Sequence, residues 1–126
     1  LKNKHVERIP ETLGDAIEAY RDNFKKLYDT GVTVLAGSDM VLYKAPSLPI
    51  HQELGYMVDY GITPMEAIRT ATYNAASVLG IENETGSLKE GLAGDLLIVK
   101  GDVSKNIRAL DDVQEVYLAG EIVYTV

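Results

Sequence analysis

Residues 32–39, Val-Thr-Val-Leu-Ala-Gly-Ser-Asp, decide the fold class of this chain. The first five are apolar or β-branched, which is typical of a strand buried on both faces of a parallel sheet. Because reacting groups gather at the carboxyl ends of parallel strands, Asp39 is the first candidate for chemistry in the chain. An Asp in this position also commonly forms an Asx-turn or caps the next segment, and position alone leaves both roles open. The stretch therefore predicts an α/β fold.

A helix is expected before this strand. Apolar residues recur at intervals of three and four across residues 13–28, with charged residues between them. Thr12 and Asp15 have the spacing of a capping box, and Gly31 stands where a helix terminator is expected. Helix, glycine turn and buried strand together form one αβ unit of a parallel sheet.

Further helices are expected after the strand. Pro49 is expected to be the first residue of a short helix that ends near Gly61. Residues 63–66, Thr-Pro-Met-Glu, combine a capping Thr, a Pro and a Glu in the order that begins a helix. Another helical stretch covers residues 75–80, and its alanines favour close helix packing over a cofactor site.

The last third of the chain changes to turns and short strands. Apolar runs at 96–99, 113–118 and 122–124 predict three strands, the last two joined by a tight glycine-containing turn. A short helical turn is expected near residues 107–110. This tail predicts a small β unit.

Composition narrows the class of protein. The chain has 126 residues, of which 46% are hydrophobic and 25% charged, as in one ordinary globular domain. It has no membrane-length apolar run and no signal stretch, so we expect a soluble, cytoplasmic protein without a membrane partner. A formal charge of −7 argues against a nucleic-acid partner. The lack of cysteine excludes disulfides, thiolate zinc sites and cysteine nucleophiles.

Two residues remain as candidates for chemistry, Asp39 and His51. Phosphate-loop, dinucleotide and serine-hydrolase motifs are absent from the sequence. An Asp at a strand end can bind a metal and take a proton from water, and His51 near the start of the next helix can point into the same site. A metal site normally needs three protein ligands, so this pair alone does not define one.

The order of short motifs resembles the amidohydrolase superfamily, most closely its imidazolonepropionase-like and Xaa-Pro dipeptidase-like branch. The resemblance covers about three quarters of the chain. Its motifs, in order, are GVTVLAGSD (31–39), HQEL (51–54), MVDYGITPMEAIRTA (57–71), TYNAASVLG (72–80), GSLKEG (86–91) and DLLIV (95–99).

The resemblance implies a fold and a reaction. Family members are (β/α)₈ barrels in which one or two divalent metals, usually zinc, activate water against a carbon–nitrogen bond of a small-molecule substrate. Residues 32–36 would be the eighth barrel strand, and Asp39 would bind metal and carry the proton of the attacking water. His51 matches a position that lines the substrate pocket. Residues 1–80 would be the last helix–strand units of the barrel, and residues 81–126 strands of the accompanying small β-sandwich.

The chain lacks much of what such an enzyme needs. Its only histidines are His5 and His51, and it has no His-x-His pair. A complete barrel takes about 250 residues. We therefore expect the C-terminal part of a metal-dependent amidohydrolase, inactive alone, whose main partner is the remainder of the parent barrel. Unpaired strand edges would favour homo-oligomers. The alternative is an independent, non-catalytic binding or assembly domain.

Overall fold

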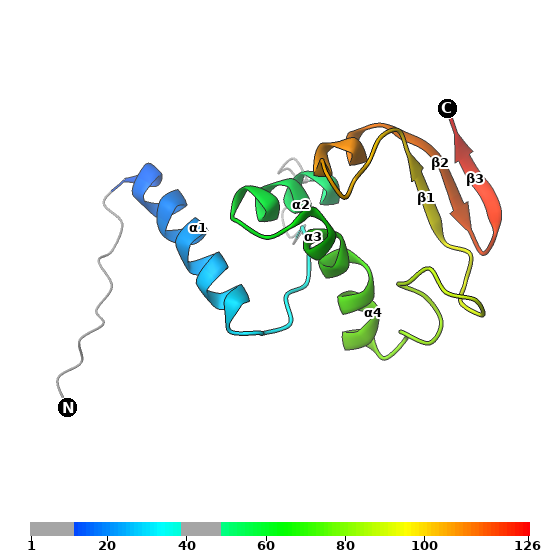
Figure 1. The fold of residues 1–126 in the computed structure, drawn as a ribbon, viewed down its shortest axis with the longest axis horizontal. Coiled ribbons are helices and arrows are strands. Elements are labelled where there is room, and N and C mark those ends of the chain that lie inside the picture. The colour runs from blue at the N-terminus through cyan, green and yellow to red at the C-terminus, as the bar shows by residue number, and fades with distance from the viewer. Residues whose placement is uncertain (1–11, 39–48) are drawn as a thin grey trace, which may run out of the picture. The chain divides into compact units, whose positions relative to one another are not determined.

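The computed structural model describes residues 12–38 and 49–126 (Figure 1). Within these ranges the chain is a mixed α/β protein with four α-helices, one 3₁₀-helix and a small antiparallel sheet. It divides into two compact units, Leu1–Val32 and Thr33–Val126. The predicted division at residue 80 stays a prediction. None of the described helices is long and apolar enough to cross a membrane.

Helix α1 spans Leu13–Asp29 in the first unit and confirms the predicted helix. Its capping box is present: the Asp15 amide donates to Thr12 Oγ1 at 3.1 Å, and the Thr12 amide donates to the Asp15 carboxylate at 3.0 Å. The helix is followed by Gly31, which has a φ of 82°. Both ends are therefore set by the residues that the sequence indicates.

The three helices of the second unit are α2 (Ile50–Asp59), α3 (Pro64–Ala71) and α4 (Tyr73–Leu79). Helix α3 has the capping box predicted from Thr63 and Glu66, and Gly80 ends α4 in the left-handed conformation. Pro49 is the N-cap of α2 and not its first helical residue, which corrects the prediction by one position. Its ψ of 142° is extended, whereas a first helical residue needs a helical ψ.

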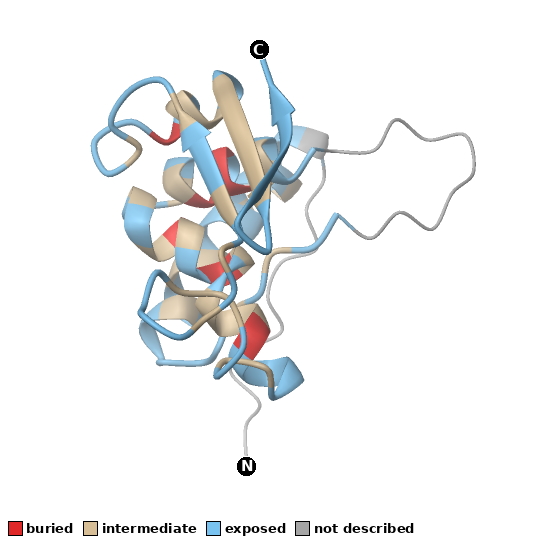
Figure 2. Ribbon diagram, turned by 90° about the vertical axis from the view of Figure 1, so that its right-hand side faces the viewer, coloured by how far each residue is buried: buried red, intermediate tan, exposed pale blue. Residues whose placement is uncertain are grey.

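The core of the second unit lies among these helices. Helix α2 packs against α3 and against the 3₁₀-helix η1 (Ile107–Asp111), and α3 packs against α4. Thr70 is fully buried, and its hydroxyl donates to the Ala67 carbonyl at 2.7 Å, which satisfies the polar group. The other residues of this core are Leu54, Met57, Ile62, Ala67, Ala76 and Ile107. The ribbon is red at buried residues in Figure 2.

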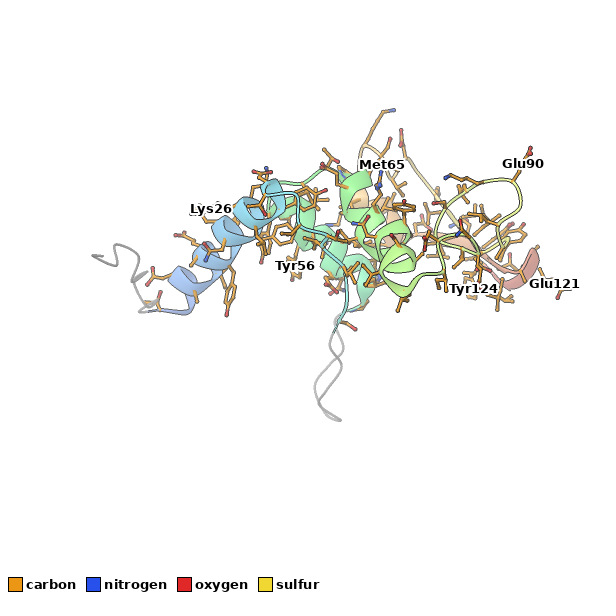
Figure 3. All side chains as sticks on the ribbon, turned by 90° about the horizontal axis from the view of Figure 1, so that it is seen from below. Lys26, Tyr56, Met65, Glu90, Glu121 and Tyr124 are labelled. Atoms are coloured by element: carbon orange, nitrogen blue, oxygen red, sulfur yellow. The ribbon has the colours of Figure 1, made fainter. Side chains whose placement is uncertain are left out.

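The sheet consists of β1 (Leu96–Val99), β2 (Val113–Leu118) and β3 (Glu121–Thr125), with β2 in the centre. Both pairings are antiparallel, with Val116 opposite Leu97 on β1 and opposite Tyr124 on β3. Every residue of β3 is exposed, including Glu121 and Tyr124, which Figure 3 labels. The predicted β unit is confirmed, and its outer strand leaves apolar side chains in solvent.

The predicted strand at residues 32–36 is wrong for this chain, because the described residues 32–38 form no strand. A strand is defined by its hydrogen bonds to a neighbouring strand, and the described part of the chain gives this segment none. Its main chain binds the helices instead. The apolar pattern identified a segment suited to a sheet, but the sheet itself needs partners that a local pattern does not supply.

Gly86 packs against the buried end of α4. It has a φ of 88°, and a Cβ placed there would lie 2.6 Å from the Ala76 Cβ and 3.2 Å from the Thr72 carbonyl oxygen. We expect Gly86→Ala to lower the free energy of unfolding by about 2–4 kcal/mol, through left-handed strain and overpacking together.

Gly91→Ala is the matched control for that substitution. Gly91 has a φ of 89°, but a Cβ there would have no atom within 4 Å, so only the backbone term of about 1 kcal/mol applies. Urea unfolding of the two variants measures the difference. Equal losses of stability would contradict the packing of Gly86 against Ala76.

Candidate active site

Asp39, the predicted catalytic residue, lies outside the described residues, as does His5. The structure does describe the segment that leads to Asp39. Three hydrogen bonds from three different helices hold residues 34–37. The candidate site is therefore built from the main chain of this segment and from the side chains that bind it.

Helices α3 and α4 bind the middle of the segment. The Asn74 side-chain amide of α4 donates to the Val34 carbonyl at 3.1 Å, and the Ala36 amide donates to the Thr70 carbonyl of α3 at 3.2 Å. In an extended chain, groups two residues apart point to the same edge, where a parallel neighbour would take this carbonyl and this amide. Asn74 and Thr70 thus take the hydrogen bonds that a neighbouring strand would take at these two residues.

Helix α2 binds the end of the segment through Glu53. The Gly37 amide donates to Glu53 Oε1 at 3.0 Å. The other carboxylate oxygen, Oε2, is buried and accepts no hydrogen bond from the residues that the structure describes. Glu53 lies in the first turn of α2, but no side chain caps the start of this helix by a hydrogen bond. Glu53 therefore serves the segment before Asp39 and not its own helix.

His51 is the second residue of α2 and lies close to Asp111 in the C-terminal part of the chain. Its Nε2 is 3.5 Å from Asp111 Oδ1 on η1, and the two side chains are 35% and 55% exposed. A second pair joins the same elements, because Arg108 Nη2 donates to Asp59 Oδ2 at 3.2 Å. Such exposed pairs contribute about 0–1 kcal/mol each. The prediction that His51 and Asp39 face the same site stays a prediction, because Asp39 is not described.

Gly55 explains the close approach of α2 and η1. A Cβ at this buried position would lie 2.5 Å from Arg108 Nη1, so the guanidinium occupies the space above the glycine. The Arg108 side chain therefore packs on the α2 backbone while it binds Asp59. This arrangement fixes the face of α2 that carries His51.

The described residues do not by themselves fit a metal centre. Among them, no three His, Asp or Glu side chains come together as a group that could hold a metal ion. A catalytic zinc site uses three protein ligands and keeps one position open. We therefore derive no reaction step through a metal from the described part of the chain.

Two tail groups have shifted pKa values. Hydrogen bonds from Lys105 and Ser104 lower the pKa of Asp102, and the hydrogen bond between Tyr117 and Glu115 raises the pKa of that tyrosine. Asp102 lies in the turn before η1, and Tyr117 lies on β2. Neither group touches residues 34–37 through a described hydrogen bond, so local pairing explains both shifts without a catalytic role.

Sequence reasoning missed Glu53 and Asn74. Both residues stand inside motifs that the sequence analysis quotes, but their partners are 16 and 40 residues away. The available signal for Glu53 was its place in the first turn of a helix whose N-cap residue is Pro49, because a proline side chain cannot cap the helix. For Asn74 the available signal was a single amide within an alanine-rich stretch.

Comparison with known proteins identifies relatives of this chain. The family model described as "Amidohydrolase family" matches residues 4–123. An ochratoxinase from Aspergillus niger is 32% identical over 102 residues, which are 76% of this chain and 20% of that protein. An imidazolonepropionase from Deinococcus radiodurans is 33% identical over 100 residues, which are 76% of this chain and 25% of that protein.

A solved structure agrees with these relatives. The crystal structure of a Xaa-Pro dipeptidase with bound methionine in the active site superposes with a TM-score of 0.75 at 34% identity. The match covers 84% of this chain and 25% of the dipeptidase. The chain thus spans about a fifth to a quarter of the length of these proteins.

Proposed function

Because this chain belongs to the amidohydrolase family, we propose that it is the C-terminal part of a metal-dependent hydrolase. The reaction is hydrolysis of a carbon–nitrogen bond in a small amide, cyclic amide or dipeptide. The observation that carries the proposal is the match to the Xaa-Pro dipeptidase, which includes 84% of this chain but only 25% of the larger protein. The imidazolonepropionase and the ochratoxinase support the same class of enzyme.

In this proposal the helices and the segment at residues 32–38 are the last units of a (β/α)₈ barrel. Residues 81–126 contribute strands to a small β-sandwich. The exposed apolar residues Ile122, Val123 and Tyr124 of β3 support a covered surface in the complete protein, because their exposed fractions are 55%, 58% and 52%. The partner is the remainder of the barrel, and in the chain alone the same strand favours self-association.

The proposed roles of the site residues follow the family resemblance. Asp39 is the acid–base residue that follows the segment, and it is a ligand of a divalent metal, zinc in our proposal. The histidines that complete such a centre belong to the rest of the protein. His51 of α2 lines the substrate pocket, and the contact with Asp111 orients its side chain.

The 126-residue chain alone is expected to have no hydrolase activity, because its described residues assemble no metal-binding group. The assay is amine release from Xaa-Pro dipeptides, N-acyl amino acids and cyclic amides, with and without added zinc. The complete gene product is the positive control. Metal-dependent turnover by the chain alone would overturn the proposed division of the site between this chain and the rest of the protein.

A further inference from the structure

Side chains from two different helices bind the segment that precedes Asp39. Glu53 from α2 and Asn74 from α4, which we call the clasp, bind the Gly37 amide and the Val34 carbonyl. We propose that the clasp positions the reacting end of this segment. Glu53 is its principal positioning residue, because it binds the main chain two residues before Asp39. The link to catalysis rests on the proposed function, whereas the clasp itself does not.

The chemistry of Glu53 fits this role. A hydrogen bond from an amide to a carboxylate is about twice as strong as one between neutral groups. Glu53 binds the amide of Gly37, which stands two residues before Asp39 in the sequence. A reacting group must be held to within a fraction of an ångström, so a strong bond two residues away has a direct effect on its place.

The arrangement of the two contacts fits a positioning device. Asn74 and Glu53 bind main-chain groups three residues apart, and the Ala36 amide between them donates to the Thr70 carbonyl. Contacts at three positions along the segment restrict its movement more than one contact alone would.

Glycine at position 37 does not itself explain the contact. A Cβ on Gly37 would have no atom of the described chain within 4 Å, so the close approach of Glu53 does not depend on the missing side chain. What Glu53 recognises is the main-chain amide. The Glu53 side chain is therefore the variable to test.

The first test measures amide hydrogen exchange of Gly37 by NMR in the 126-residue chain. Loss of a hydrogen bond to a carboxylate in Glu53→Ala is expected to speed exchange by about 10-fold or more. Glu53→Gln keeps an acceptor oxygen in the same place, so exchange stays within about threefold of the parent chain. Unchanged exchange in Glu53→Ala would overturn the clasp.

Glu82→Ala is the matched control. Glu82 is also half-buried and has a buried carboxylate oxygen that no described residue hydrogen-bonds, but it makes no described bond to residues 34–37. Its replacement is expected to leave Gly37 exchange unchanged. If Glu53→Ala does not fold, Glu53→Asp takes its place, since the shorter side chain withdraws the carboxylate and speeds exchange in the same direction.

The second test measures kcat and KM of the complete gene product. Glu53→Ala is expected to lower kcat about 10- to 100-fold, with KM changed less than about threefold, because misplacement of a reacting group affects the chemical step. Glu53→Gln is expected to restore most of kcat, and Glu82→Ala to change neither constant. A loss in Glu53→Ala confined to thermal stability, with kcat unchanged, would overturn the positioning role.

The two tests separate the inference from the proposed function. If the unaltered complete gene product hydrolyses none of the carbon–nitrogen substrates, the proposed function fails. Exchange of the Gly37 amide then still decides whether Glu53 holds the segment. If the enzyme is active and Gly37 exchange responds to Glu53→Ala while kcat does not, the clasp is structural and the positioning role is excluded.

Discussion

Replacement of Asp39 by Asn in the complete gene product is expected to lower kcat by at least about 100-fold. The amide has nearly the same shape as the carboxylate but cannot take a proton and binds cations weakly. A positioned acid–base group contributes about 10²- to 10⁴-fold to a rate, so the loss falls in this range or beyond it. Steady-state kinetics with the best substrate of the panel measures the change.

Asp22→Asn is the control for this substitution. Asp22 is an exposed carboxylate on α1 with no described hydrogen bond to residues 34–37, and its neutralisation changes the net charge by the same amount. We expect kcat and KM to stay within about twofold of the unaltered enzyme, as is usual for surface substitutions. A folded Asp39→Asn enzyme with undiminished kcat would remove Asp39 from the reaction.

The parts of the fold that were predicted correctly depend on local chemistry. Thr12 with Asp15 and Thr63 with Glu66 form capping boxes, which use residues only three positions apart. Gly80 ends α4 because it adopts the left-handed conformation that other residues avoid. Such signals act within one helical turn, so a single sequence is enough to read them.

The predictions that failed depend on distant partners or on a single dihedral angle. Residues 32–36 have the composition of a buried strand, but a strand also needs neighbours, and the described chain supplies helices instead. Pro49 fits the N-cap and the first helical position almost equally well by its φ of −59°, and only its ψ separates the two. Local patterns do not fix either feature.

The candidate site was predicted only in part, for a related reason. Asp39 is a candidate because a carboxylate after an apolar run has a recognisable place in α/β folds, and its role stays a prediction. Glu53 and Asn74 were missed because their hydrogen bonds connect residues 16 and 40 positions apart. Polar contacts of this range become visible only when the helices are placed in space.

The alternative function, a non-catalytic binding or assembly domain, makes a different prediction about the gene. An amidohydrolase needs histidines in addition to the two in this chain, typically a His-x-His pair that follows a strand. Sequence upstream of Leu1 with such a pair favours the enzyme. A gene that encodes this chain without such a partner segment favours the assembly domain.

The central claim, that this chain completes a metal-dependent hydrolase, is tested most directly by the metal content of the complete gene product. We expect at least one divalent metal per chain by elemental analysis, loss of about 99% or more of the activity after chelation, and recovery of activity on addition of zinc. Full activity in a protein shown to be free of metal would contradict the claim.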